Sequence, residues 1–337
     1  MKFLSPELLK KFEQVRNETS LLVVGDCILD RYFFGEVNRI SPEAPVPVFE
    51  LRKITYRLGG AANVAANLRG IGVNTYLMGI VGADEKGEVL KAMAQKLGIN
   101  AEGVVSDSTR PTIIKTRVIA QSQQLLRIDR EEKKKPEKEL QIKLQEVYED
   151  LLNEVSGVII SDYAKGMFLS DSFCSWVIHE AKRRGKLVFV DPKSDLWKKY
   201  EGATTITPNL KEFKAVISRE NLKPDLVDAA SYLVKKYGLE FLVITKGKEG
   251  IMAYHPEKGK VELPAYAKEV YDVSGAGDTV IACFSAFYTA GMGLEHSLEF
   301  ANVAAGIVVG KVGTQPVYWE EIKSFVDENY KKEVCHG

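Results

Sequence analysis

Short apolar runs alternate along the chain with longer segments in which apolar residues recur at helical spacing. The short runs are rich in β-branched residues and predict strands at Leu21–Gly25, Thr75–Val81, Val158–Ser161, Leu187–Asp191, Thr204–Thr207 and Phe241–Thr245. The longer segments predict helices at Glu88–Leu97, Glu139–Asn153, Ser172–Arg184, Leu226–Tyr237 and Gly277–Ala290. Several strands are apolar on both faces, as a sheet covered by helices on both sides requires. The pattern therefore predicts an α/β fold with a mainly parallel sheet.

Two segments, at about residues 32–54 and 111–130, interrupt this alternation. Each contains a β-rich stretch, Val46–Leu51 in the first and Thr112–Ile119 in the second, without a helical pattern. The two could pair into a small separate sheet that projects from the main domain as a lid over a ligand, or they could extend an edge of the main sheet. Because the chain shows no internal repeat and no interdomain linker, we predict a single domain over residues 1–337 with these lid segments.

Composition narrows the class of ligand. The 337 residues carry 46 Lys and Arg against 46 Asp and Glu, so electrostatics gives no reason to expect nucleic acid or an anionic membrane as a partner. The longest apolar stretches are strand-sized and far shorter than the ~20 residues of a membrane helix. The N-terminal residues lack the apolar core and cleavage site of a secretory signal. We therefore expect a cytoplasmic protein that binds a small molecule.

The segment Asp272–Thr279 is the strongest candidate for chemistry. Its small residues Gly275, Ala276 and Gly277 precede an apolar helix, so backbone N–H groups can approach an anion at the positive end of the helix dipole. Such an anion hole would hold phosphoryl oxygens during transfer, and Asp278 directly after it could accept the proton of an attacking hydroxyl. Alternatively, Asp278 caps the helix that closes a glycine-rich turn, and these residues alone favour neither interpretation.

A second glycine-rich segment precedes an alanine-rich helical stretch. Gly59 and Gly60 permit a tight turn and close packing of this helix on the sheet, and the Asn63 amide can bind hydroxyl groups. Close packing alone would also explain the two glycines. The segment lacks the GxGxxG spacing of a dinucleotide site, and the chain contains no GxxxxGKS or GxxxxGKT phosphate loop.

A third segment follows a predicted strand and opens a helix. Asn209 and Glu212 enclose Leu210 and Lys211, and their three-residue separation places them on one helical face. There they could hold Mg²⁺ through water or contact phosphate, which suits an ion that keeps part of its hydration shell. A helix-capping arrangement is the alternative, and these residues alone favour it.

Charged residues follow several of the predicted strands. Asp26 and Asp30 come after the first strand, near the carboxyl end of the sheet, where open α/β folds bind ligands. The candidate phosphate ligands are four basic residues spread along the chain, namely Arg31, Arg127, Lys165 and Lys193. For any one of them, a surface ion pair is the alternative explanation.

Together and in this order, these segments resemble the PfkB or ribokinase family of carbohydrate kinases over nearly the whole chain. Gly59–Asn63, with Gly72 and Gly82 further on, is similar to the first motif of that family, and Asp272–Thr279 is similar to the second. The resemblance implies a doubly wound α/β domain with a β-sheet lid. It also implies direct transfer of the γ-phosphoryl group of MgATP to a sugar hydroxyl.

The resemblance further implies roles for individual residues. Asp278 would be the catalytic base beside the anion hole, and Asn209 with Glu212 matches an NxxE motif near Mg²⁺ and the phosphates. The residues that would border ATP or lie near its adenine are Thr245, Lys246, Gly247 and Asn302. A monovalent cation such as K⁺ would bind near Asp272, Ser274 and Gly313.

Within this family, further stretches resemble the bacterial kinases of D-glycero-β-D-manno-heptose 7-phosphate: Gly25–Tyr32, Arg39–Val48, Ser161–Gly166, Asp191–Lys193 and Glu269–Val273. This resemblance implies phosphorylation at the anomeric O1, giving the 1,7-bisphosphate on the way to ADP-heptose for the lipopolysaccharide core. Fixed cations would bind the 7-phosphate and orient O1 toward the base. The predicted substrate site comprises Lys165, Lys193, Arg31 and Arg127 for the phosphate, together with Asp26, Asp30, Gly59, Gly60 and Asn63.

The resemblance also bears on protein partners. In many bacteria this kinase is fused to a C-terminal adenylyltransferase domain, but the present sequence ends soon after Gly313–Pro316 and contains no HxGH motif. We therefore expect a stand-alone kinase, with adenylylation left to a separate adenylyltransferase. Because the exposed edges of the lid strands can pair between subunits, we also expect a homodimer joined through the lids.

Three other functions are compatible with parts of the sequence. The chain could be a family member that phosphorylates another sugar, such as ribose, fructose or adenosine, although Ser41–Pro45 and Ser161–Gly166 argue against it. It could be a noncatalytic nucleotide- or sugar-binding regulator, but a pure binder has no use for Asp278 as a base. An NAD-type oxidoreductase is suggested only by the α/β alternation and the glycine-rich turns, and the dinucleotide fingerprint is missing.

Overall fold

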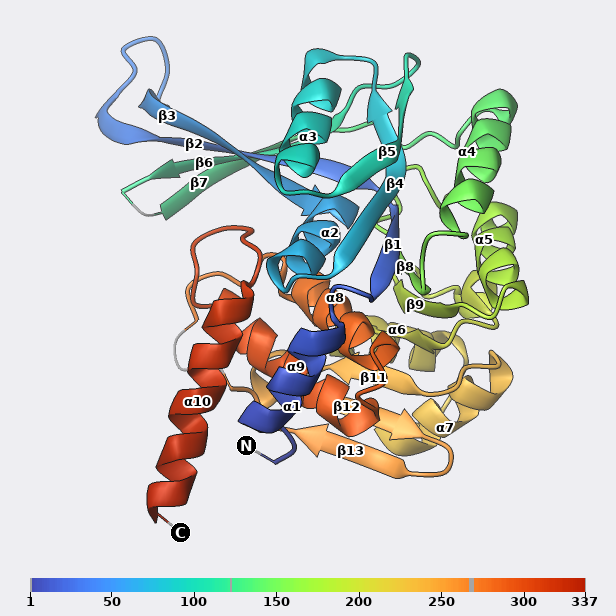
Figure 1. The fold of residues 1–337 in the computed structure, drawn as a ribbon. Helices are drawn as coiled ribbons and strands as arrows, with labels where there is room; N and C mark the ends of the chain where they lie inside the picture. The colour runs from blue at the N-terminus through green and yellow to red at the C-terminus, as the bar shows by residue number, and fades with distance from the viewer. Residues whose placement is uncertain (1, 122, 267–269, 337) are drawn as a thin grey trace.

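The chain folds around a central parallel sheet of six strands (Figure 1). The computed structural model describes residues 2–121, 123–266 and 270–336, with side chains as far as residue 330; Ser122 and Glu269, from segments singled out above, lie outside these ranges. The sheet order is β10-β9-β8-β1-β4-β5, and every pair in it is parallel. The strands are β1 (Ser20–Gly25), β4 (Asn74–Gly82), β5 (Asn100–Asp107), β8 (Gly157–Ser161), β9 (Leu187–Asp191) and β10 (Thr205–Ile206).

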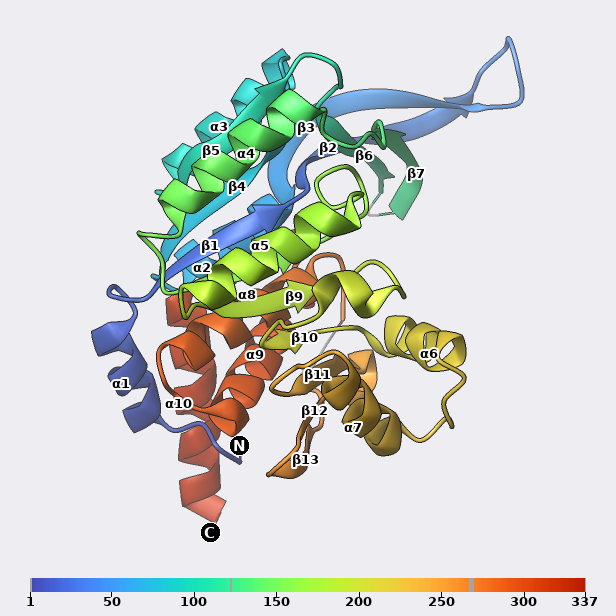
Figure 2. The same ribbon diagram turned by 90° about the vertical axis from the view of Figure 1, so that its right-hand side faces the viewer.

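Successive side chains of β1 enter two different hydrophobic cores, because a strand alternates its faces. Leu21 and Val23 belong to one core and Leu22 and Val24 to the other. The first core also contains side chains of α1 (Pro6–Val15), α2 (Ala61–Gly70), α3 (Glu85–Lys96), α8 (Ala276–Thr289), α9 (Leu294–Val308) and α10 (Trp319–His336). The second contains side chains of α4 (Lys138–Leu151), α5 (Asp171–Arg183), α6 (Leu210–Arg219) and α7 (Leu226–Lys236). Figure 2 shows α5 in front of the sheet and α2 and α8 behind it, which confirms the predicted doubly wound arrangement.

The lid segments form a sheet of their own, so the alternative of an extended main sheet is wrong. This lid sheet has the order β3-β2-β6-β7, and its strands are β2 (Cys27–Ile40), β3 (Pro47–Gly60), β6 (Ile113–Ala120) and β7 (Gln123–Arg130). The β2 and β6 strands pair in parallel, whereas the two outer pairs are antiparallel. The β2–β3 ribbon starts earlier and ends later than predicted, since it continues directly from β1 and runs into α2. In Figure 1 the lid sheet projects away from the helical layers.

The strand predicted at 241–245 is confirmed, but it does not join the parallel sheet. The observed β11 (Leu242–Thr245) pairs antiparallel with β12 (Ile251–His255), which pairs with β13 (Gly259–Leu263) to complete a separate three-stranded sheet. A single turn of 3₁₀ helix at Gly247–Glu249 returns the chain from β11 to β12, so the two strands form a hairpin. Beside this sheet, Asn209 and Thr245 form an isolated parallel β-bridge. Among the described residues, no helix is long and apolar enough to cross a membrane.

Candidate active site

The start of α8 carries the predicted anion hole and base. Gly275 precedes the helix with a left-handed φ of 80°, and a Cβ atom there would lie 2.8 Å from Asn63 Nδ2. Only glycine combines that backbone conformation with so close an approach. The turn therefore brings α8 against α2, and it sets the first helical N–H groups and the Asp278 side chain on the same side of the sheet.

The Asp278 carboxylate joins two other segments of the chain rather than capping its own helix. Asn63 Nδ2 of α2 donates to Asp278 Oδ2 at 2.7 Å, and the Tyr163 hydroxyl donates to Oδ1 at 2.6 Å. Asp278 is 3% exposed, and the N-cap of α8 is Gly275, which makes no side-chain capping bond. The capping interpretation of Asp278 is therefore wrong, because its acceptors are used across the fold.

The surroundings of Asp278 keep it a usable base at neutral pH. Burial raises the pKa of Asp278 to about 6, while the hydrogen bonds from Asn63 and Tyr163 oppose this rise. The Asp30 carboxylate adds to the rise in pKa, and the Lys115 ammonium counters it. A carboxyl group with a pKa near 6 is ionised at pH 7 yet accepts a proton more readily than an ordinary aspartate, which suits general base catalysis.

Tyr163 was missed as a site residue, although its segment was singled out. Burial first, and then the charge of Asp278, raises the pKa of Tyr163 well above its ordinary value. Its hydroxyl therefore remains protonated and serves as a donor to the carboxylate. Nothing in the local pattern of Ser161–Gly166 indicates that this side chain reaches a residue more than a hundred positions away.

Asp26 was predicted to bind substrate, and the structure corrects this. Its buried carboxylate accepts hydrogen bonds from the backbone N–H groups of Tyr163 at 3.1 Å, Lys165 at 3.0 Å and Met167 at 2.9 Å. Both oxygens are thus committed to the loop that follows β8. Asp26 builds the loop that presents Tyr163, because a buried carboxylate requires donors and the backbone supplies them.

Both carboxylate oxygens of Asp30, at the base of the lid sheet, also accept hydrogen bonds within the protein. Arg117 Nη1 donates to its Oδ1 at 2.6 Å, and Thr314 Oγ1 donates to its Oδ2 at 3.0 Å. A Cβ atom on Gly59 would lie 2.6 Å from Asp30 Oδ2, and one on Gly60 would lie 2.5 Å from the Asp26 carbonyl oxygen. The two glycines therefore allow the lid ribbon to pass these carboxylates closely. Asp30 contributes its charge to the site, but its oxygens are already paired.

The four predicted phosphate ligands do not form one cluster. Lys165 pairs with Glu131, and Lys193 pairs with Glu212 at 3.1 Å. Arg31 donates to Thr116 Oγ1 at 2.9 Å within the lid sheet, and Arg127 pairs with Asp129 at 3.0 Å on the outer strand β7, whose residues are all exposed. Each of the four thus has a partner of its own in a different part of the fold, and phosphate binding by them stays a prediction.

One basic residue near the base was missed. Lys115 of β6 holds its ammonium group 5.1 Å from the ring centroid of Tyr163. Burial lowers the pKa of Lys115, the Asp30 carboxylate opposes this, and the Lys165 ammonium lowers it further. Lys115 and Arg117 are two positions apart on β6, so they share a face. This spacing of two basic residues within a lid segment is the feature of the sequence that could have indicated Lys115 as a site residue.

A polar cavity of about 320 Å³ lies beside Asp278, and it contains the Asn209 and Glu212 pair. The two form a capping box, in which Glu212 N–H donates to Asn209 Oδ1 at 2.9 Å and Asn209 N–H donates to Glu212 Oε2 at 3.1 Å. The capping interpretation is thus correct, and the residues still border the cavity. Leu210 and Lys211, in the first turn of α6, are absent from its lining.

Asp191 makes this polar cavity suitable for a cation. Burial, followed by the charges of Asp278 and Glu212, raises the pKa of Asp191 well above its ordinary value, while Lys193 opposes the rise. Carboxylates that disfavour one another in this way gain from a shared cation with oxygen ligands, such as Mg²⁺. Within the described residues, no group of three or more His, Cys, Asp or Glu side chains is arranged to hold a metal by itself. The residues thus fit an ion that also takes oxygens from a phosphate ligand.

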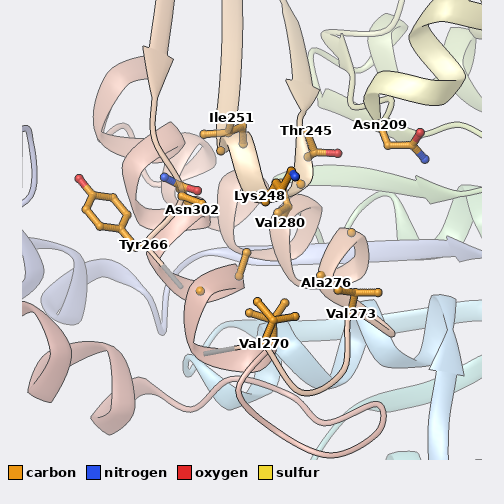
Figure 3. Close-up of a pocket in the computed structure, with 17 residues that line it drawn as sticks. Asn209, Thr245, Lys248, Ile251, Tyr266, Val270, Val273, Ala276, Val280 and Asn302 are labelled. Atoms are coloured by element: carbon orange, nitrogen blue, oxygen red, sulfur yellow. The ribbon is translucent and has the colours of Figure 1, made fainter. Parts of the chain in front are cut away.

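An apolar cavity of about 280 Å³ continues from the polar one, since both include Asn209, Thr245, Val273 and Gly277 in their lining. Figure 3 shows its wall, with Ile251 and Val270 on opposite sides, Asn302 and Val280 between them, and Tyr266 and Asn209 at the two ends. Of the residues predicted to border ATP, Thr245, Gly247 and Asn302 line this cavity. Lys246 does not line it, because its ammonium group pairs with Glu262 at 2.5 Å.

The predicted monovalent-cation residues come together near these cavities. Asp272 Oδ1 accepts a hydrogen bond from Ser274 N–H at 2.8 Å, and Oδ2 accepts one from Gly313 N–H at 3.0 Å. These bonds join the turn before α8 to the segment after α9. The contact fixes the loop that carries the anion hole, and cation binding there stays a prediction.

Comparison with known proteins gives the family. Residues 18–321 match the family described as pfkB family carbohydrate kinase. Over 305 residues the chain is 45% identical to the bifunctional protein HldE of Methylobacillus flagellatus, which covers 90% of this chain and 62% of that protein. The chain spans less than two thirds of the length of curated relatives of this kind, 62% to 65% of each.

Solved structures agree on the fold. Arabidopsis thaliana ribokinase complexed with ribose and ATP has a TM-score of 0.70 and 20% identity, covering 91% of this chain and 98% of that chain. Phosphofructokinase-2 from Escherichia coli in complex with potassium has a TM-score of 0.72 and 17% identity, covering 92% and 99%. With the family match over most of its length and a buried carboxylate beside a helix N-terminus, the chain belongs to the pfkB family of carbohydrate kinases and is a sugar kinase.

Proposed function

We propose that this sugar kinase phosphorylates O1 of D-glycero-β-D-manno-heptose 7-phosphate with ATP. The observation that carries the proposal is a pair of lysines beside the base, Lys115 from the lid strand β6 and Lys165 from the loop after β8. Lys115 lies over the Tyr163 ring, and its charge acts on both Asp278 and Lys165. The two ammonium groups repel each other even though Lys165 also pairs with Glu131, and the phosphate dianion of a sugar phosphate would relieve the repulsion. An unphosphorylated sugar offers no such partner.

The base and the anion hole divide the chemistry between them. Asp278 would take the proton of O1 while that oxygen bonds to the γ-phosphorus and the bond to the β,γ-bridging oxygen breaks, leaving ADP. N–H groups of the first turn of α8 would stabilise the charge on the transferred group. Ala276 N–H already donates to Val273 O at 3.3 Å, so Gly275 and Gly277 are the expected donors.

The joined cavities would accommodate the nucleotide. The apolar cavity leads into the polar cavity, and this order matches a purine base followed by a polyphosphate. We assign the adenine to the side with Val280 and Asn302, and the phosphates to the side with Asn209 and Glu212. Bound Mg²⁺ would neutralise the phosphate charge, and Glu212 and Asp191 would hold it with Asn209 acting through water.

The first prediction concerns the base. Asp278→Asn keeps the shape and the buried volume but cannot accept a proton, so we expect kcat to fall by about 10³-fold. ADP release in the presence of heptose 7-phosphate measures this. Asp225→Asn is the matched control, since Asp225 only caps the exposed start of α7. Turnover of Asp278→Asn within tenfold of the wild type would remove Asp278 from the mechanism.

The second prediction concerns the phosphate of the substrate. Lys115→Met and Lys165→Met each remove one charge, so kcat/KM for heptose 7-phosphate should fall about 10- to 100-fold. Their kcat/KM for heptose without the phosphate should change much less, and this ratio is the measurement. Arg127→Met serves as the control, because Arg127 lies on the exposed strand β7. A wild-type enzyme that uses both sugars equally well contradicts the proposed substrate and leaves the kinase activity itself intact.

The third prediction concerns the expected homodimer, which the lid surface supports. Large apolar side chains are exposed on the lid segments, namely Ile40, Val46, Leu51, Ile54, Leu125, Leu126 and Ile128. A second copy of the chain packed on this sheet would bury them. Light scattering should give the mass of a dimer, and Leu126→Glu should shift it to the monomer. Leu97→Glu, at an exposed position outside the lid, should leave the dimer unchanged. A monomeric wild type at working concentration would refute the lid dimer.

A further inference from the structure

Hydrogen bonds to two buried carboxylates fix the backbone of the loop after β8. Asp26 accepts its backbone N–H groups at Tyr163, Lys165 and Met167, and Asp162 Oδ1 accepts that of Ala164 at 2.8 Å. Ala164 has a left-handed φ of 53°, a conformation that costs a non-glycine residue about 1 kcal/mol. Two buried carboxylates thus fix consecutive amides around a strained residue, and the strain lies next to Tyr163.

The same loop is also fixed through the side chain of Asp162. Asp162 Oδ2 accepts hydrogen bonds from Lys199 Nζ at 2.6 Å and from the Tyr200 hydroxyl at 2.6 Å, and all of these groups are buried or nearly so. Lys199 Nζ donates as well to the carbonyl oxygen of Phe168 at 3.2 Å. Such a network is costly to break, because each partner would be left unpaired away from water. The position of the Tyr163 hydroxyl is therefore set by the scaffold rather than by its own rotamer alone.

We propose that Tyr163 is a positioning residue for the phosphoryl transfer, orienting Asp278 and stabilising its carboxylate form through their 2.6 Å hydrogen bond. With Tyr163 on Oδ1 and Asn63 on Oδ2, a hydrogen bond holds each oxygen of the carboxylate in place, and Asp278 lines the polar cavity. This inference rests on the proposed function in one respect, since it takes Asp278 to be the base. It adds the means by which a base buried in the fold stays ionised.

The charges around Asp278 require such a donor. Burial disfavours its carboxylate form most, and the charge of Asp30 from β2 disfavours it further. Asp191, at the end of β9, is itself made harder to ionise by the charge of Asp278. Lys115 from β6 and the donors Asn63 and Tyr163 act in the other direction. Removing one donor should therefore raise the pKa of Asp278, and the base would then be protonated at pH values where the wild type is active.

The test compares Tyr163→Phe with Tyr200→Phe. Both variants lose one buried hydroxyl from the same loop network, but only Tyr163 contacts Asp278. We expect the acid limb of the kcat/KM profile to move about one pH unit higher in Tyr163→Phe, with near-normal activity on the alkaline side. In Tyr200→Phe the limb should stay where it is. An equal loss at every pH in Tyr163→Phe, or an unshifted profile, would overturn the proposal.

A second readout needs no sugar, so it separates this inference from the proposed substrate. The Asp278 carboxyl carbon can be titrated by ¹³C NMR and assigned by its disappearance in Asp278→Asn. Its pKa should be about 6 in the wild type and higher in Tyr163→Phe. If heptose 7-phosphate is not a substrate but this shift occurs, the substrate is wrong and the role of Tyr163 holds. An identical titration in the two proteins means that the tyrosine does not act on the base.

Discussion

The site depends on one buried carboxylate that is shared by three distant segments. Asp278 at the start of α8 accepts hydrogen bonds from Asn63 in α2 and from Tyr163 after β8. Both helices belong to the first hydrophobic core, whereas Tyr163 follows a strand of the parallel sheet. The carboxylate is therefore satisfied only when α2 and α8 pack together at the end of β8.

The other buried acids divide into scaffold and ligand groups by what already occupies their oxygens. Asp26 accepts hydrogen bonds from the loop after β8, Asp162 accepts them from that loop and from Lys199 and Tyr200, and Asp30 accepts them from Arg117 and Thr314. Asp191 differs, since its charge is opposed by neighbouring carboxylates and faces the polar cavity. A buried carboxylate whose oxygens already accept hydrogen bonds stabilises the structure. A buried carboxylate that faces other negative charges is suited instead to binding a cation, alone or together with the phosphate that the cation accompanies.

Periodicity and motif spacing predicted much of this arrangement. The parallel strands, the lid segments and the glycine-rich start of α8 follow from patterns within short windows, because burial and turn chemistry are local properties. The antiparallel β11–β13 sheet was missed since a short strand gives no sign of its partner's direction. Tyr163 and Lys115 were missed for a related reason: each gains its role from a contact with a residue far along the chain. Asp26 is the converse case. Its position at the end of a strand was predicted correctly, but its carboxylate oxygens accept hydrogen bonds from backbone N–H groups.

The central claim is that this carbohydrate kinase directs its base at the anomeric hydroxyl of a sugar that already carries a phosphate. Proton-coupled ³¹P NMR of the product from ATP, Mg²⁺ and D-glycero-β-D-manno-heptose 7-phosphate tests it directly. The account predicts a new phosphorus resonance coupled to the anomeric proton, while the resonance of the 7-phosphate persists. A new phosphate coupled to any other ring or chain proton, or the absence of a second phosphate while another sugar is phosphorylated, would contradict it.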